Sequence, residues 1–144
     1  MRIANVILKQ SSMNYKIDHV GYLTGNIELT AKEFERIGYS SGDIYCDDTQ
    51  KTRICFLTRP NEVRVELVEP YEENKTMQKM LVKRGVAPYH ICYETDDIDS
   101  EYESLIQNNW TALFKPVSAP AFGNRRICYF FNSDIGFVEF VNKK

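Results

Sequence analysis

The sequence predicts an α+β fold built from two similar βαβββ modules, because the second half of the chain repeats the pattern of the first. The segment HVGYLT, which begins at His19, aligns with HICYET, which begins at His90, at an offset of 71 residues. Arg53–Val68 aligns without a gap with Arg126–Val141, and six of these sixteen positions are identical. Matched helix and strand patterns accompany both blocks, so we infer an internal duplication.

The first module is expected to span residues 15–70. Behind Asn26, a good helix N-cap, apolar residues recur at the spacing of a packed helix, and Gly38 supplies its stop. Alternating apolar and β-branched residues predict the strands around this helix. The expected elements are a strand at Lys16–Thr24, a helix at Ile27–Ile37, and strands at Asp43–Asp47, Lys51–Thr58 and Glu62–Glu69.

The second module is expected to span residues 88–142 and to follow a linker helix at residues 74–85. Asn74 is the expected N-cap of the linker helix, and Asp97 that of the helix in the second module. Residues 1–14 form either a loose tail or an added edge strand, and residues 1–144 are expected to be one domain. The expected elements of the second module are a strand at Tyr89–Thr95, a helix at Ile98–Gln107, and strands at Ala112–Val117, Arg125–Asn132 and Phe137–Asn142.

Composition restricts the classes of function. A chain of 144 residues is long enough for one domain with a hydrophobic core. Its formal net charge of −2 gives no support to nucleic-acid or membrane-surface binding. The first apolar run, Ile3–Leu8, is too short for a signal peptide or a spanning helix, so we expect a cytoplasmic protein. The four cysteines form no C-x-x-C pair, which favours reduced core thiols.

Four residues with metal-binding side chains occupy equivalent positions in the two modules. The only two histidines lie in the first strand of each module, and matched glutamates lie in the last strands between apolar neighbours. Since alternate strand residues face opposite ways, these side chains fall on the face away from the helices. A single strand histidine or glutamate is usually structural, but two imidazoles and two carboxylates together suit one divalent cation, which also removes the cost of burying unpaired carboxylates. The sequence therefore predicts a metal ion shared by His19, Glu66, His90 and Glu139.

Over residues 15–142 the chain resembles the vicinal oxygen chelate superfamily, which includes glyoxalases, bleomycin resistance proteins and dioxygenases. It is most similar to methylmalonyl-CoA epimerases, in the segments IDHV at Ile17, VELVEP at Val65, HI at His90, DDI at Asp96 and GFVE at Gly136. The resemblance implies mixed sheets that curl around one metal-bearing cavity, as in the glyoxalase fold. It also implies the four ligands named above, with about two coordination positions left for water or substrate oxygens. Cobalt, nickel, zinc, manganese or iron suits such a ligand set.

This resemblance implies an isomerase that removes a proton next to a metal-polarised carbonyl. We expect Glu139 to act as the base, with Glu66 facing it across the substrate. Return of the proton at the opposite face gives epimerisation, whereas its return to a neighbouring carbon gives the glyoxalase I reaction. The chain departs from the epimerases at Tyr89, where many have a second histidine, and at Thr52–Cys55, where some have an acid that serves as a second base.

Several alternatives stay open at this stage. The substrate is expected to be a small molecule such as an acyl thioester on a carrier, and homodimer formation is left open. A lactoylglutathione lyase is the second candidate function, and a non-catalytic binding or resistance protein is the third, although such proteins generally lack the full ligand set. Arg53 and Arg126 either pair with acids such as Asp47 or Asp48, or hold a carboxylate or phosphate of the substrate. Residues 118–124 are expected to form a mobile loop over the site.

Overall fold

The computed structural model describes residues 15–144, so the expectations for residues 1–14 lie outside the described residues. The first half contains β1 (Lys16–Leu23), α1 (Ile27–Arg36), β2 (Ser40–Asp47), β3 (Thr52–Thr58) and β4 (Arg64–Pro70). Helix α2 (Lys75–Arg84) leads to the second half. That half contains β5 (Ala87–Thr95), α3 (Ile98–Gln107), β6 (Thr111–Ala112), β7 (Val117–Ser118), the short 3₁₀ helix η1 (Pro120–Phe122), β8 (Arg126–Asn132) and β9 (Gly136–Asn142).

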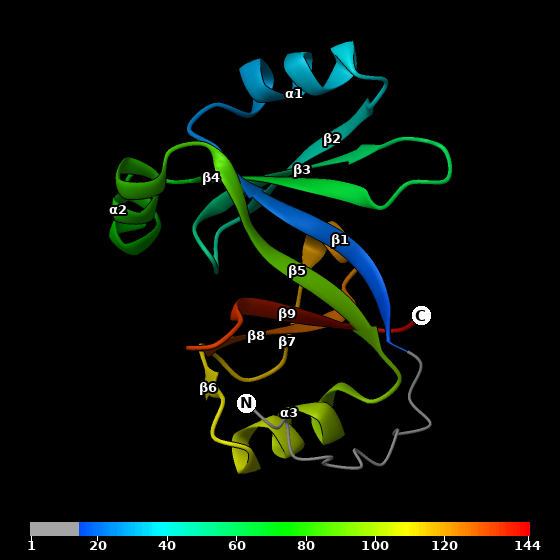
Figure 1. The fold of residues 1–144 in the computed structure, drawn as a ribbon, viewed down its shortest axis with the longest axis vertical. Helices are drawn as coiled ribbons and strands as arrows, with labels where there is room; N and C mark the ends of the chain where they lie inside the picture. The colour runs from blue at the N-terminus through cyan, green and yellow to red at the C-terminus, as the bar shows by residue number, and fades with distance from the viewer. Residues whose placement is uncertain (1–14) are drawn as a thin grey trace, which may run out of the picture.

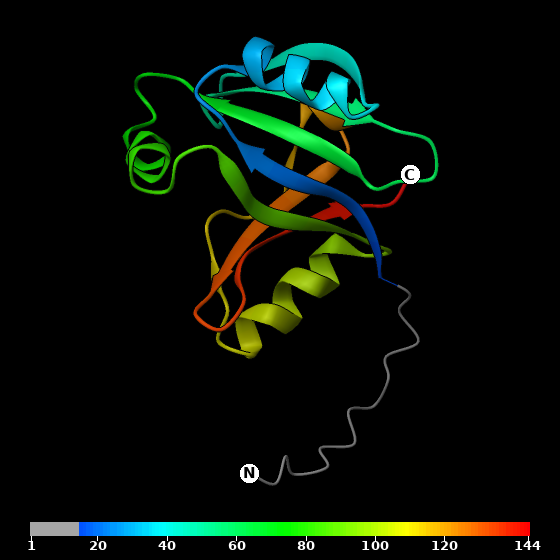
Figure 2. The same ribbon diagram turned by 45° about the horizontal axis from the view of Figure 1, so that its top comes forward.

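The strands form one sheet that curls without closing, and its two halves have the same pairing pattern. The strand order is β2-β3-β4-β1-β5-β9-β8-β6, with β7 paired to β8. Strand β1 pairs in parallel with β4, β5 pairs in parallel with β9, and the antiparallel pair β1–β5 joins the halves. Helices α1 and α3 cover opposite ends of this arrangement, while α2 stands to one side (Figures 1 and 2). The predicted α+β fold of two related modules is therefore confirmed.

The predicted helix caps are present. The side chains of Asn26, Asn74 and Asp97 each accept a hydrogen bond from a backbone N–H in the first turn of α1, α2 and α3, respectively. These bonds satisfy donors that a helix leaves unpaired at its start. Gly38 adopts a φ of 97° just beyond α1, in the left-handed region that favours glycine at a helix stop.

Two strand predictions needed correction. Strand β2 begins at Ser40 rather than Asp43. Its pairing with β3 shifts register between Ser41 and Ile44, and this irregularity interrupts the alternation of apolar and polar residues by which the start of a strand is recognised in the sequence. The strand expected at Ala112–Val117 is instead divided into β6 and β7. Pro116 in this interval has no N–H to give to a strand ladder, so the chain leaves the sheet and returns to it.

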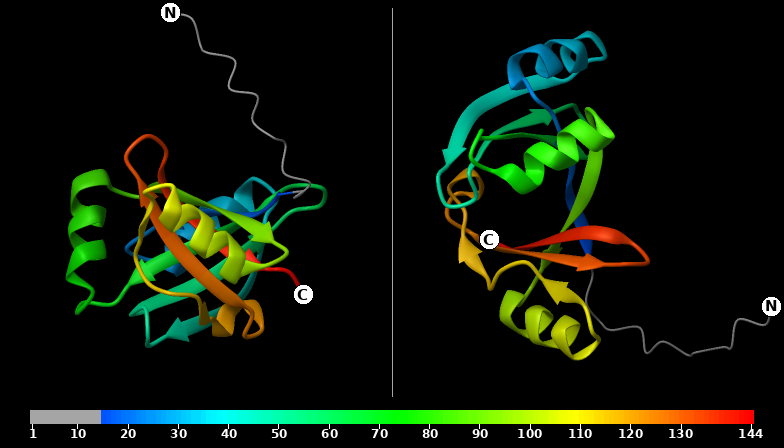
Figure 3. Two further views of the ribbon diagram at one scale, coloured as in Figure 1. Left: turned by 90° about the horizontal axis from the view of Figure 1, so that it is seen from below. Right: turned by 90° about the vertical axis from the view of Figure 1, so that its left-hand side faces the viewer.

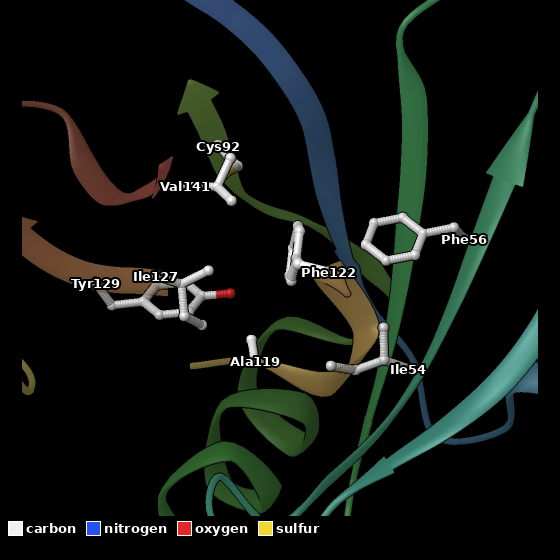
Figure 4. Close-up of a cluster of buried hydrophobic side chains, with 8 residues drawn as sticks. All are labelled: Ile54, Phe56, Cys92, Ala119, Phe122, Ile127, Tyr129 and Val141. Carbon is white, nitrogen blue, oxygen red and sulfur yellow. The ribbon is translucent and has the colours of Figure 1, made fainter. Parts of the chain in front are cut away.

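Three clusters of buried side chains follow the strand alternation. One lies between α1 and the first half of the sheet, and another lies between α3 and the second half. The third lies on the concave side, where both halves contribute side chains (Figure 4): Ile54, Phe56, Cys92, Ala119, Phe122, Ile127, Tyr129 and Val141. Helix α1 packs on Val65 and Leu67, so the residue between them, Glu66, faces the concave side.

The segment at residues 118–124, which was expected to form a mobile loop over the site, contains helix η1 and packs into the concave core. Ala119 and Phe122 are buried, and the Phe122 ring packs against the rings of His19 and Phe56. Helix η1 also contacts β2, an element from the other half of the chain (Figure 3, right). The segment is therefore anchored in the concave core.

Cys55, Cys92 and Cys128 are buried free thiols, as expected, whereas Cys46 is exposed. Among the described residues no helix is both long and apolar enough to cross a membrane.

Packing under α3 yields a first prediction. Phe130 is fully buried against the rings of Tyr102, Trp110 and Phe140. Phe130→Ala should lower the free energy of unfolding by about 3–5 kcal/mol, because it removes the buried ring and leaves a cavity. The measurement is chemical denaturation followed by circular dichroism, with Phe131→Ala as the matched control, since Phe131 is 39% exposed. Equal losses in the two variants would contradict this account of the core.

Candidate metal centre

The four predicted ligand residues lie on the four central strands of the sheet. His19 is on β1, Glu66 on β4, His90 on β5 and Glu139 on β9, and these strands are neighbours in the order β4-β1-β5-β9. The register is equivalent in the two halves. Gly21, two residues after His19, is paired with Glu66, and Cys92, two residues after His90, is paired with Glu139. The duplication therefore brings both histidine–glutamate pairs to one place.

The functional atoms of these four side chains converge. The two histidine Nε2 atoms lie 3.1 Å apart. Glu66 Oε1 lies 3.4 Å from each Nε2 atom. Glu139 Oε1 lies 2.9 Å from the Nε2 atom of His19 and 3.2 Å from that of His90. All four residues are between 0 and 4% exposed.

These separations suit four ligands of one divalent cation. Bonds of about 2.1 Å place two ligand atoms about 3.0 Å apart at a right angle and about 3.4 Å apart at the tetrahedral angle. The five measured distances fall between 2.9 and 3.4 Å. Two imidazole nitrogens and two carboxylate oxygens form a donor set that several first-row metals accept.

The hydrogen bonding of the cluster also fits a shared cation. Despite the short distances, Glu66 Oε1 and both carboxylate oxygens of Glu139 accept no hydrogen bond from the described residues. Buried carboxylate oxygens without partners are costly. The side chains thus point at a common centre instead of at one another, as ligands do.

Charge within the cluster shifts the pKa values of its members. Burial alone lowers the pKa of His19, but the Glu66 charge and a hydrogen bond with Asp18 outweigh burial and raise it well above its usual value. Burial raises the pKa of Glu66, yet His19 and His90 together hold it well below the usual range. For His90, burial lowers the pKa and contacts with Glu139 and Glu66 raise it on balance. The Glu66 carboxylate therefore remains ionised and requires positive charge nearby.

Asp18 fixes the orientation of the His19 ring. Asp18 Oδ2 lies 2.7 Å from His19 Nδ1 and accepts a hydrogen bond of 2.8 Å from Arg64. Burial raises the pKa of Asp18, but the hydrogen bonds with His19 and Arg64 outweigh it and lower the pKa. An Nδ1–H that donates to a carboxylate leaves Nε2 as the nitrogen that faces the cluster, an arrangement common behind metal-binding histidines.

A cavity of about 710 Å³ reaches this centre and is lined by both halves of the chain and by α2. Glu66, Tyr89 and Tyr129 line it at the ligand cluster. Its other walls are largely apolar and consist of Ile54, Val68, Met77, Met80, Leu113, Phe114, Val117, Phe131 and Phe137. Thr49, Gln50, Thr52, Asn74, Thr76 and Thr111 add neutral polar groups. The volume lies within the range of small-molecule sites.

Sequence analysis did not identify Tyr129 as a site residue. Its hydroxyl lies 3.2 Å from His90 Nε2, and its ring packs edge-on against the His90 ring with centroids 5.1 Å apart. In the internal repeat Tyr129 aligns with Phe56, whose ring packs against His19 at 5.5 Å. This alignment could have identified Tyr129 from the sequence, because the two aromatic residues occupy equivalent positions and only Tyr129 has a hydroxyl group.

The structure places Arg53 and Arg126 on the helix-covered side, outside the residues that line the cavity. Arg53 forms ion pairs with Glu28 and Glu69. Arg126 donates two hydrogen bonds to Asp99 at the start of α3. The acids are therefore not Asp47 or Asp48, and the substrate-binding role expected for these arginines receives no support from their position.

Comparisons with known proteins agree with this architecture. A hypothetical protein from Bacillus halodurans has 21% sequence identity and a TM-score of 0.79, over 91% of this chain and 96% of that one. Methylmalonyl-CoA epimerase from Mycobacterium tuberculosis has 21% identity and a TM-score of 0.78, over 89% and 87% of the two chains. The Streptomyces coelicolor epimerase in complex with 2-nitronate-propionyl-CoA has 20% identity and a TM-score of 0.78, over 89% and 94%.

At these identities the solved structures establish a shared fold. No curated protein matches the chain by sequence. A family model does match, over residues 18–129, which include three of the four candidate ligands and most of the cavity lining. The chain therefore belongs to the Glyoxalase/Bleomycin resistance protein/Dioxygenase superfamily.

Proposed function

We propose that this protein is a divalent-metal-dependent isomerase of the epimerase type, which moves a proton next to a carbonyl group of a small-molecule substrate. One observation carries the proposal: four buried donor atoms converge at one edge of an apolar cavity, and three buried carboxylate oxygens of the two glutamates lack a hydrogen-bond partner among the described residues. His19, Glu66, His90 and Glu139 would hold the metal. When bound, the cation would polarise the carbonyl and so acidify the neighbouring C–H bond.

Glu139 and Glu66 are the residues proposed to carry the proton. Glu66 lines the cavity directly, whereas Glu139 lies behind it against both histidines. Strand β3 presents Thr52 and Ile54 to the cavity, so it offers no third carboxylate there. A base needs to lie within hydrogen-bond reach of the proton that it removes; Glu66 is the carboxylate that lines the described cavity, and Glu139 adjoins it in the ligand cluster.

Tyr129 is proposed to orient the substrate oxygen. Its hydroxyl lies beside His90 Nε2 and lines the cavity. Burial, followed by the Glu139 charge, raises the pKa of Tyr129 well above its usual value, so the hydroxyl stays protonated. With His90 Nε2 engaged as a metal ligand, this hydroxyl would be available to donate a hydrogen bond to a substrate oxygen next to the centre.

Similarity to methylmalonyl-CoA epimerases in fold favours the isomerase over a glyoxalase I-like lyase, and acyl thioesters are the first substrates to test. The complete set of four donor residues favours either enzyme over a binding protein that lacks a metal.

Gly21 supports the proposal independently, because the position of the His90 ring requires a glycine there. A Cβ atom at Gly21 would lie 2.0–2.4 Å from three atoms of the His90 imidazole. The ring therefore occupies the space that a side chain would need across the β1–β5 pair. Gly21 is the ladder partner of both Glu66 and His90, so it lies at the junction of the two half-sites.

The first test of the proposal is metal content. Protein purified without chelators should contain one divalent ion per chain, and His90→Ala should lower its metal affinity by more than about 100-fold, since outer-shell changes alone cost 10- to 100-fold. Elemental analysis and competition with a chromophoric chelator measure this. Glu101→Gln is the control, because Glu101 is a buried glutamate outside the cluster that bonds to Tyr15. Equal metal affinities of the wild type and His90→Ala would show that His90 is not a metal ligand and would contradict the proposed centre.

The second test concerns proton transfer. Glu139→Gln should reduce turnover by about 100-fold or more, because an amide cannot accept the proton. The measurement is exchange of solvent deuterium into racemic 2-methyl acyl thioesters, with Glu66→Gln assayed in parallel. Far-UV circular dichroism should show that the fold is intact, and Glu101→Gln should retain wild-type exchange. Unchanged exchange in Glu139→Gln would remove Glu139 from the mechanism.

The third test concerns Gly21. Gly21→Ala should lower metal affinity about tenfold or more, because the methyl group displaces the His90 ring from its position. Gly25→Ala is the matched control, since a Cβ atom there would meet only the end of the Leu81 side chain, at 3.3 Å. Chelator competition measures both variants. Similar affinities in the two would show that the His90 ring does not depend on this close approach.

A further inference from the structure

The cavity at the proposed metal centre lacks a cationic side chain that could pair with a carboxylate or phosphate of a substrate. Among the described residues that line it, Glu66 is the one charged side chain, and it belongs to the ligand cluster. The remaining lining residues are apolar or carry neutral hydroxyl and amide groups. No lysine, arginine or histidine of residues 15–144 lines the cavity.

The basic residues next to lining positions do not line the cavity themselves; they are Lys51, Arg53, Lys75, Lys79 and Lys115. Arg53 lies between two lining residues of β3, but its guanidinium is on the opposite face and pairs with Glu28 and Glu69. Lys75 and Lys79 lie beside lining residues of α2 and are exposed. A carboxylate buried in this cavity would therefore lose its hydration without gaining a charged partner. The metal centre itself would be the one position that compensates an anion.

We propose that this cavity holds an uncharged apolar portion of the substrate, an aliphatic or aromatic group attached to a metal-chelating head, and that it excludes an anionic group at that position. The proposal deepens the proposed function and rests on it, because the chelating head requires the cation. Apolar side chains from both halves, such as Ile54, Met77 and Phe137, would surround the group. A volume of about 710 Å³ accommodates a medium-length chain or a ring.

Three hydroxamic acids test this inference, because they share one chelating head and differ in the tail. Acetohydroxamate has a minimal tail, hexanohydroxamate has an apolar tail, and adipic acid monohydroxamate has a chain of the same length that ends in a carboxylate. Their dissociation constants are measured by isothermal titration calorimetry on the cobalt-loaded full chain. Each buried methylene should strengthen binding about fourfold at most, so hexanohydroxamate should bind at least about tenfold more tightly than acetohydroxamate. The carboxylate-tailed compound should bind no better than acetohydroxamate.

A charge introduced into the wall supplies the reverse test. Leu113 lines the cavity and is 51% exposed, so a polar side chain is tolerated there without unfolding. Leu113→Arg should bind the carboxylate-tailed compound about tenfold more tightly than wild type does, while the affinity for acetohydroxamate stays the same. Leu113→Gln is the neutral control and should not show this gain.

Binding of the carboxylate-tailed compound to the wild type as tightly as hexanohydroxamate would overturn the inference and leave the metal centre standing. Equal affinities of acetohydroxamate and hexanohydroxamate would also overturn it. Failure of the chain to take up cobalt would overturn the proposed function, and this inference with it.

Discussion

The antiparallel pairing of β1 with β5 is the interaction on which the rest of the structure depends. It joins the two halves through their first strands, so each histidine lies beside the other half of the chain. Each of these strands then pairs in parallel with the last strand of its own half, which delivers a glutamate. A shift of one residue in the β1–β5 register would turn one histidine toward the helices, because side chains alternate between the faces.

Burial of the two glutamate carboxylates is energetically unfavourable unless positive charge lies nearby. Two buried carboxylates at the centre of a small protein need two positive charges, supplied either by protons on both imidazoles or by one divalent cation. Protons satisfy the charge but leave Glu139 without a hydrogen bond in the observed geometry. A cation at the common centre satisfies the charge and all four donors. Metal binding would then stabilise the folded chain as well as equip it for catalysis.

Much of this structure could be predicted, because strand alternation is a local pattern and the internal repeat can be read directly from the sequence. The repeat indicated the fold and the positions of the helix caps. The alternation of side chains along each strand placed Glu66 and Glu139 on the face opposite the residues that pack against the helices. The cavity was not predictable, because its walls come from β3, α2 and the interval between β6 and β7, which meet only through tertiary packing. Arg53 shows the same limit: its position in the strand was evident, but its partner Glu28 lies on a helix whose placement the pattern did not determine.

Differences between the two repeats decide from which side the centre is reached. Before the first histidine stands Asp18, which is half-buried and accepts a hydrogen bond from Arg64, while Phe56 and Phe122 pack on the His19 ring. The equivalent positions in the second half are Tyr89 and Tyr129, which line the cavity; both rings pack against the His90 ring, and the Tyr129 hydroxyl lies 3.2 Å from His90 Nε2. Duplication thus supplies a symmetric set of candidate ligands, and divergence of the neighbouring residues packs one side of this set with aromatic rings and leaves the other side next to the cavity. A substrate of the proposed enzyme would consequently approach the centre between Glu66 of the first half and the two tyrosines of the second half.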